Sequence, residues 1–236
     1  MSNAQKDLFY TIALAFFILT ATITITIFAS YLLFAFDIKH YYLEQAVSLK
    51  YSTIMKNYAQ MMDYLINPFN WHFQLSDFAS SASGRLHFED CKKLFLLNFG
   101  VFIGTGLIVA KFRRVRARYN RIFLWIGIFG IVLAILMLLN FDEFFVIFHE
   151  VLFRNSDWLF DPNKDPVINI LPEEFFTQCF VLFFILFEGL NFWKANKKTF
   201  RKLILNAFFR LFLRAVIKIG INDTRTIPIM INEKCS

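Results

Sequence analysis

LFYTIALAFFILTATITITIFASYLLFAF, residues 8–36, is an uncharged run that decides the fold class of this chain. A membrane-spanning helix needs about 17–25 mostly apolar residues, so the run is long enough to cross a bilayer. Its threonines, Thr20 to Thr26, do not exclude a helix, because their hydroxyls can bond carbonyls of the preceding turn. A signal peptide is the alternative, but the apolar core is too long and no small-residue cleavage site follows.

Three further apolar runs, at residues 94–110, 122–140 and 175–193, are also near the length of a spanning helix. Hydrophobic residues make up 57% of the chain, including 33 Phe, while charged residues make up 18%. Soluble domains carry about 25% charged residues, so this composition indicates an integral membrane protein. We expect an all-α fold with a four-transmembrane-helix bundle, forming a single membrane domain over residues 1–236.

The charges between the runs are distributed asymmetrically. Residues 111–121 carry only positive charges, and the tail 194–236 is also basic. By contrast, the charged residues within 142–174 are mostly acidic. The positive-inside tendency therefore predicts a cytoplasmic basic loop and two cytoplasmic termini. The loops 37–93 and 142–174 would then be extracellular and form a mainly helical cap. The net charge of +7 is thus a topology signal, and no nucleic-acid-binding motif accompanies it.

The basic tail contains a further periodic segment. Between residues 200 and 219, positive or polar residues recur every fourth position, and apolar residues line another face. This pattern is typical of an amphipathic helix that lies on an anionic membrane surface. A fifth span is less consistent with the sequence, because Arg210 and Arg214 would lie near its middle.

Two of the four histidines occupy matching places beside the predicted spans. His87 lies about two helical turns before the second span, and His149 lies about two turns after the third, so each stands about 10–14 Å beyond a span. Both would emerge on one side of the bilayer. Two groups that titrate near neutral pH at a lipid–water boundary indicate acyl or proton-transfer chemistry on a lipid. A pair of haem ligands is disfavoured, because these histidines flank the spans instead of lying inside the membrane. His40 and His72 stand beside aromatic residues, which suggests interface or loop positions.

The remaining reactive residues give weaker signals. No metal-ligand spacing and no nucleotide-binding or serine-hydrolase motif is present, so we expect no metal and no cofactor. A disulfide between Cys91 and Cys179 is conceivable. Gly100-x-x-x-Gly104 suggests helix contact, and Glu188 inside the fourth span is either functional or reaches the inner interface.

Two loop motifs resemble those of the lipoprotein intramolecular transacylases of Gram-positive bacteria. The first is Tyr58-Ala59-Gln60-Met61-Met62-Asp63-Tyr64-Leu65-Ile66-Asn67-Pro68, followed by Ser83-Gly84-x-x-His87-Phe88-x-Asp90-x-Lys92. The second, longer and more specific, is Phe148-His149-x-x-x-Phe153-x-x-x-Asp157-Trp158-x-Phe160-Asp161-Pro162-x-x-Asp165-Pro166-x-Ile168, followed by Leu171-Pro172-Glu173-x-Phe175-Phe176. The resemblance covers roughly residues 8–193, and it departs at Cys91, where an aliphatic residue is expected.

The resemblance implies a substrate and a reaction in the bacterial cell membrane. The substrate is a diacylglyceryl lipoprotein, whose sn-2 acyl chain moves to the α-amino group of its own N-terminal cysteine and leaves the lyso form. The donor ester and the acceptor amine belong to one molecule, so an enzyme that holds them together replaces a bimolecular encounter with an intramolecular reaction. The amine, with a pKa of about 7.7–8, must lose a proton before it attacks, and a neutral imidazole is a suitable base.

Site residues follow from this resemblance. We expect His87 and His149 to be catalytic, one as general base and the other stabilising the oxyanion or positioning the ester. Arg85, Asp90, Asp157 and Trp158 would support them or bind substrate, although Arg85 and Asp157 are equally compatible with structural salt bridges.

Two other functional classes remain open on the sequence. One is a non-catalytic membrane protein that binds lipid or a partner at its outer cap. The other is a metal-dependent lipid hydrolase that uses His72, His87, His149 and acidic residues. The sequence indicates neither the preferred lipoprotein nor the oligomeric state.

Overall fold

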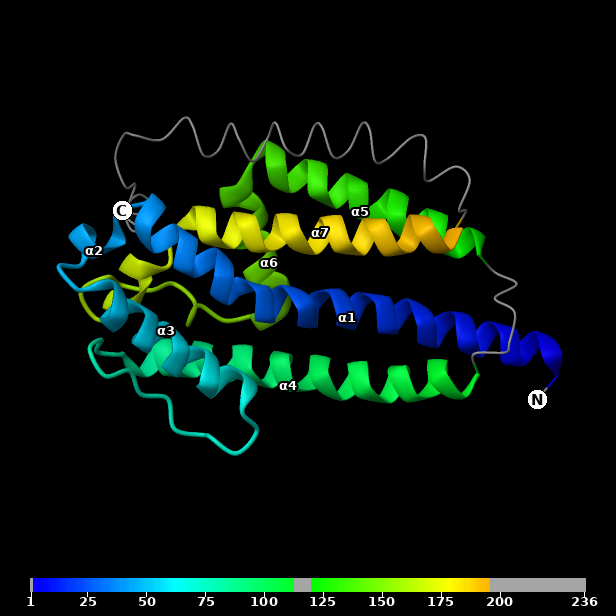
Figure 1. Cartoon of the computed structure of the whole chain (residues 1–236), viewed down its shortest axis with the longest axis horizontal. Coiled ribbons are helices and arrows are strands. Elements are labelled where there is room, and N and C mark those ends of the chain that lie inside the picture. Colours follow the sequence, from blue (N-terminus) through cyan, green and yellow to red (C-terminus); the bar gives the residue numbers. More distant parts are fainter. Residues whose placement is uncertain (1, 113–119, 196–236) are drawn as a thin grey trace. The chain divides into compact units, whose positions relative to one another are not determined.

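The computed structural model describes residues 2–112 and 120–195, and over these residues every regular element is helical. Four long helices are apolar enough to cross a membrane (Figure 1): α1 (Asn3–His40), α4 (Ala82–Lys111), α5 (Arg121–Leu139) and α7 (Glu173–Ala195). The shorter elements are α2 (Leu43–Ala46), α3 (Tyr51–Ile66), α6 (Phe141–Phe153) and a 3-10 helix, η1 (Pro166–Ile170). The expected amphipathic helix over 200–219 lies outside the described residues.

The four expected spans are present as helices, and the largest difference concerns the second. Helix α4 begins at Ala82, well before the apolar run that starts at Leu94. Its 30 residues correspond to about 45 Å, whereas the hydrocarbon core of a bilayer is about 30 Å thick. The charged side chains of α4 between Arg85 and Lys93 therefore belong to a polar extension, residues 82–93, that precedes the spanning part. His87 lies in this extension.

The threonine-rich part of α1 is helical, and several of its hydroxyls bond within the helix. Thr20 donates to the carbonyl of Phe16 at 2.8 Å, and Thr26 donates to the carbonyl of Thr22 at 2.9 Å. These bonds satisfy the hydroxyls of Thr20 and Thr26 within α1, while the Thr24 hydroxyl accepts from Asn98 of α4 at 2.9 Å. The run can therefore face apolar surroundings despite its threonines.

The described residues pack into two units. The first contains the described residues within 1–28, 98–141 and 178–224. Its core is formed by Tyr10, Leu14, Ile18 and Phe123. A Cβ added at Gly104 would meet nothing within 4 Å, and the same holds at Gly100. The expected helix contact at these two glycines is therefore not made within the described part of the chain.

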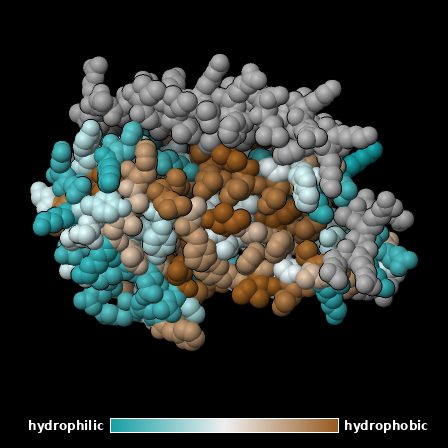
Figure 2. All heavy atoms as spheres, in the orientation of Figure 1, coloured by the Kyte–Doolittle hydropathy of each residue, from teal (hydrophilic) through white to brown (hydrophobic). Residues whose placement is uncertain are grey.

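The long helices leave large apolar side chains exposed. Leu107, Phe129 and Leu139 are each exposed by more than 60%, at 68%, 64% and 77%. In Figure 2, hydrophobic residues gather over the long helices, and hydrophilic residues gather over α2 and α3. Extensive apolar exposure is unfavourable in water but is what a lipid-facing surface requires. The chain is a multi-pass membrane protein.

The second unit contains the described residues within 29–97 and 142–177. An aromatic cluster holds α3 against α1 here, because the rings of Phe34 and Tyr58 stack at 4.0 Å. Phe175, at the start of α7, packs edge-on against Phe34 at 5.5 Å, and the Tyr58 hydroxyl bonds Ser30 at 2.6 Å. This packing brings together segments that are distant in sequence, within the unit that also contains the two conspicuous histidines.

Candidate active site

His87 and His149 lie next to each other in the second unit. His87 comes from the polar extension of α4 and His149 from α6, and their ring centroids are 5.7 Å apart. Each is only 8% exposed. The sequence placed both on one side of the membrane, and the structure brings them into a single pair.

The tautomer of His149 is set by a backbone carbonyl. The Nδ1 atom lies 2.7 Å from the carbonyl oxygen of Phe145, one turn earlier in α6. A carbonyl can only accept, so Nδ1 must carry the proton and donate it. Nε2 is then the nitrogen with the lone pair, and it is the atom of His149 that can take a proton from a substrate.

His87 is enclosed by aromatic rings. Phe153 and Phe160 contact it edge-on, at centroid distances of 4.8 Å and 5.5 Å. The Cys91 thiol lies 3.4 Å from His87 Nε2, one turn along α4, whereas the buried Nδ1 atom has no hydrogen-bond partner. Since Cys91 is a free thiol, the conceivable disulfide with Cys179 is not formed.

Burial keeps both imidazoles neutral. Burial, together with the nearby His149, lowers the pKa of His87 to about 4, although the Asp90 charge acts in the opposite direction. Burial also lowers the pKa of His149, and the hydrogen bond to Phe145 partly offsets this effect. In the Cys91 thiol, burial raises the pKa to about 12. At neutral pH the site therefore holds two uncharged imidazoles and a protonated thiol.

The segment after α6 lines the site with Trp158. Its indole ring lies 4.9 Å from the His149 ring, and its Nε1 donates to the carbonyl of Asn155 at 2.8 Å. Asn155 also donates to Asp90 Oδ2 at 3.2 Å, which links this segment to α4. Trp158 is thus held as an apolar wall beside the general-base candidate.

The other expected site residues make no hydrogen bond to either imidazole. The carboxylate of Asp90 accepts from Lys93 at 3.0 Å and from Asn155, so it acts on His87 only through its charge. Arg85 is exposed and donates to the carbonyl of Ser80. Asp157 is half-buried, and its backbone N–H donates to Asn155 Oδ1.

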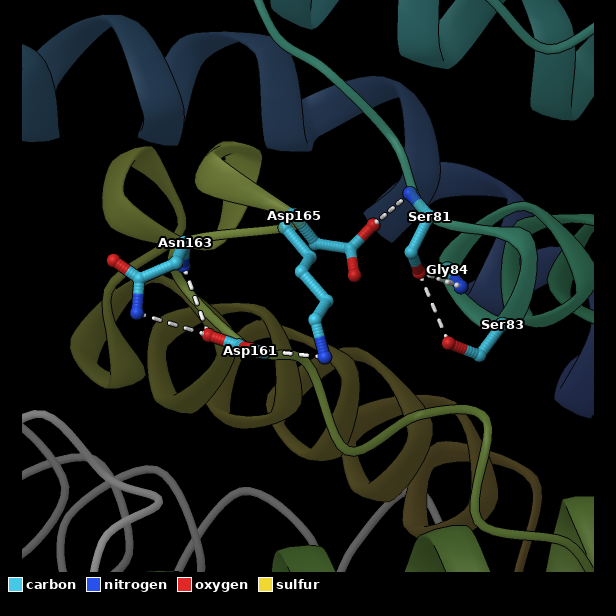
Figure 3. Close-up of polar contacts among 7 residues, drawn as sticks. Ser81, Ser83, Gly84, Asp161, Asn163 and Asp165 are labelled. Atoms are coloured by element: carbon cyan, nitrogen blue, oxygen red, sulfur yellow. Dashed lines mark hydrogen bonds and ion pairs between the residues drawn. The ribbon is translucent and has the colours of Figure 1, made fainter.

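Sequence reasoning missed how the start of α4 is held (Figure 3). The Oδ1 atom of Asp165 accepts from the backbone N–H of Ser81 at 2.7 Å, across 84 positions of sequence. A Cβ at Gly84 would lie 2.2 Å from that oxygen, so only glycine fits there without a shift. Gly84 and Asp165 each stand in one of the quoted motifs, and their place in the motifs was the only sequence sign that they matter. No sequence pattern indicates that the two motifs touch.

The two remaining histidines lie apart from the pair. The exposed His40 stacks on Phe36 at 5.1 Å. His72 is exposed and lines an open pocket of about 480 Å³ with Lys56, Asp63 and polar neighbours. Within residues 2–112 and 120–195, no three His, Cys, Asp or Glu side chains are placed to hold a metal ion.

Comparison with known proteins connects this geometry to a family. The family model described as lipoprotein intramolecular transacylase Lit matches residues 8–176. The solved structure of membrane-integral Lit from Bacillus cereus is 24% identical, with 90% of this chain and 96% of that chain covered and a TM-score of 0.73. A histidine-to-arginine variant of it is 23% identical, with 93% and 96% covered and a TM-score of 0.64. A search of curated proteins gives no match. At these identities the structural likeness shows the fold.

Proposed function

Because this chain belongs to the lipoprotein intramolecular transacylase Lit family, we propose that it moves the sn-2 acyl chain of a diacylglyceryl lipoprotein to the α-amino group of the same lipoprotein's N-terminal cysteine. The observation that carries the proposal is the pair of buried, neutral imidazoles, His87 and His149, inside an aromatic enclosure. Such a pair can move protons near neutral pH without carrying a charge into an apolar site.

His149 is the general base in this proposal. Its Nε2 lone pair removes a proton from the attacking amine, and the Phe145 carbonyl stabilises the resulting imidazolium through the Nδ1 hydrogen bond. The amine nitrogen bonds to the ester carbonyl carbon and forms a tetrahedral intermediate. When the carbon–oxygen bond to glycerol breaks, the departing oxygen takes the proton back from Nε2. For the neutral amine, this proton transfer closes the cycle without net gain or loss; the proton that the ammonium form must shed beforehand goes to solvent.

His87 stabilises the oxyanion in this proposal. The Cys91 thiol is protonated and can donate to His87 Nε2, which places the ring proton on Nδ1. A buried N–H without an acceptor costs about 1–3 kcal/mol, and the substrate oxygen would relieve that cost as it becomes negative. The low pKa of His87 suits a residue that donates a hydrogen bond while it stays neutral.

The aromatic residues around the pair suit the acyl chains of the substrate. Trp158 forms a wall beside His149, and Phe160 lies beside His87. Arg85, which is exposed, retains free guanidinium donors for the ester carbonyls, and Asp90 tunes His87 by its charge. For Asp157 we propose a supporting role in the segment that carries Trp158.

We place this site at the extracellular face of the membrane, with both termini in the cytoplasm. The support is the excess of Lys and Arg in residues 111–121 and in the tail 194–236. A cysteine introduced at Asn163 should react with an impermeant thiol reagent in intact cells, whereas one introduced at Asn120 should not. Reversed labelling would overturn this placement.

Mass spectrometry of lipoprotein N-termini tests the function. In a host that makes diacylglyceryl lipoproteins with a free N-terminus, the protein should yield N-acylated lyso lipoproteins of unchanged total mass. Loss of one acyl chain would instead show hydrolysis, and gain of one chain would show an external acyl donor. An unchanged, unacylated N-terminus would support a passive binding protein.

Chelation separates the transacylase from the metal-dependent hydrolase. The proposed steps use only imidazole and amine groups, so activity should survive exhaustive treatment with a chelator. Loss of activity that added zinc restores would contradict the proposed chemistry.

A further inference from the structure

The N-terminus of α4 is capped by two segments that are far apart in sequence (Figure 3). Ser81 precedes the first residue of α4, and its hydroxyl accepts the backbone N–H of Gly84 at 2.9 Å. This is the usual N-cap bond, from the capping side chain to the third helical residue. The backbone N–H of Ser81 itself is satisfied by the Asp165 carboxylate at 2.7 Å.

This arrangement is a capping box whose acid comes from elsewhere. In an ordinary capping box, Glu or Gln at the third helical position reaches back to the N–H of the N-cap residue. Here that position is Gly84, which has no side chain, and Asp165 occupies the vacant space. The carboxylate is only 3% exposed, so the cap is also a buried connection between α4 and the segment before η1.

The connection joins the two sides of the histidine site. Gly84 is less than one turn before His87 in α4, so a shift at the start of the helix moves the imidazole. Asp165 follows Phe160, which packs against the His87 ring at 5.5 Å. The backbone around Asp165 is fixed as well, since its N–H donates to the carbonyl of Asp161 at 2.7 Å.

We propose that Asp165 is a positioning residue of the acyl-transfer site, which docks the segment carrying Trp158 and Phe160 onto the start of α4 and thereby sets His87 against His149. The inference rests on the proposed function for its catalytic consequence only. Asp165 touches neither imidazole and acts through the placement of both sides of the site. Small errors in the placement of reacting groups can cost on the order of 10²-fold in rate.

Three single variants test the connection in the full-length purified protein. Asp165→Ala should lower kcat about 10- to 100-fold with little change in KM. It should also lower Tm by about 2–4 °C, as expected for a lost cap in a protein of this size. Asp165→Asn keeps an acceptor oxygen and should retain most of the activity. Asp161→Ala is the matched control, because Asp161 accepts from Asn163 and Lys164 within its own turn. It should behave like the unaltered protein.

A readout independent of activity is the chemical reactivity of His87. Carbethoxylation located by mass spectrometry should be slow at the buried His87 and fast at the exposed His72, which serves as an internal reference. Asp165→Ala should accelerate modification of His87 relative to His72, and Asp161→Ala should not. If the unaltered protein forms no lyso lipoprotein, the proposed function fails, while this reactivity still decides the positioning role.

A double variant separates positioning from simple helix capping. Gly84→Glu with Asp165→Ala returns the carboxylate to α4 itself, in the space that the aspartate leaves. We expect Tm to recover, while kcat stays low and His87 stays reactive, because the connection to the Trp158 segment is still absent. Recovery of Tm, kcat and normal His87 reactivity together in the double variant would overturn the proposal. So would a kcat and a His87 reactivity that stay unchanged in Asp165→Ala. Should the double variant not fold, equal loss in Asp165→Asn and Asp165→Ala would contradict the hydrogen-bond connection.

Discussion

The two units of this protein bury polar groups in different ways. In the first unit, polar side chains mostly bond within their own helix, as Thr20 and Thr22 do in α1. In the second unit, they bond across segments, as Asp165 does to Ser81 and Asn57 does to Asp77. Helical bonds of the first kind leave many apolar substitutions possible, whereas cross-segment bonds fix particular residues in particular places. Reactive geometry requires the second kind.

The largest expected effect comes from removing either imidazole of the second unit. His87→Ala and His149→Ala should each lower transacylase activity about 10²- to 10⁴-fold, the usual range for general acid–base catalysis. Activity is measured as the fraction of N-acylated lipoprotein at equal amounts of protein in the membrane. His40→Ala is the control and should leave activity unchanged. Near-full activity in either site variant would exclude that histidine from its proposed role.

A buried lysine should be the strongest structural link of the second unit. Lys92 is fully buried and donates to the carbonyls of Tyr64 and Asn67, where the C-terminus of α3 favours a cation. Lys92→Met keeps the apolar stem but leaves these carbonyls without their donor. We expect a loss of about 1–3 kcal/mol in the free energy of unfolding, measured by denaturant titration in detergent.

The neighbouring Lys93 provides the matched control. It is exposed and pairs with Glu89 and Asp90 at 3.0 Å, the kind of surface ion pair that contributes at most about 1 kcal/mol. Lys93→Met should therefore change stability much less than Lys92→Met. Equal effects of the two substitutions would show that burial does not distinguish these lysines.

In the first unit, the expected sensitivity is steric. Glu188 of α7 is buried, and a Cβ at Gly130 of α5 would lie 1.8 Å from its Oε1 atom. Gly130→Ala should cost about 1–3 kcal/mol of stability by overpacking, and Glu188→Ala should relieve much of that cost in a double-mutant cycle. Gly104→Ala, which meets open space, should be close to neutral. Additive effects at Gly130 and Glu188 would contradict the close contact.

A further expected effect is a pH dependence of stability that originates in the second unit. Burial lowers the pKa of His87 to about 4, against an ordinary value of 6.5. Between these values the unfolded chain binds a proton that the folded protein does not, so the free energy of unfolding falls as pH falls from 6.5 towards 4. His87→Gln should flatten the fall of Tm over this range, and His40→Gln should not. The same slope in His87→Gln would contradict a buried neutral imidazole.

The sequence predicted the first unit more completely than the second, for a physical reason. Spanning helices are dictated by length and hydropathy, which are local properties, so all four were predicted. The start of α4 at Ala82 was missed, because its cap depends on Asp165, a residue 84 positions from Ser81. No local pattern contains that contact.

The histidine site was predicted in its members but not in its geometry. Motif and position singled out His87 and His149, yet the Nδ1 proton of His149 follows from a carbonyl in the same helix, which only coordinates show. Asp90 has the spacing to face His87, but Lys93 and Asn155 occupy its carboxylate. Competition for a polar group depends on neighbours from other segments, and spacing within one helix does not include them.

An isotope-labelled substrate tests the central claim most directly. Purified protein would be incubated with a synthetic diacylglyceryl lipopeptide whose sn-2 acyl chain alone is deuterated, and the product fragmented by mass spectrometry. Migration of the sn-2 chain predicts an unchanged total mass, the deuterated chain on the cysteine nitrogen and the unlabelled chain on glycerol, with no such product from His149→Ala. An unlabelled chain on nitrogen, or loss of the deuterated chain as free fatty acid, would contradict it.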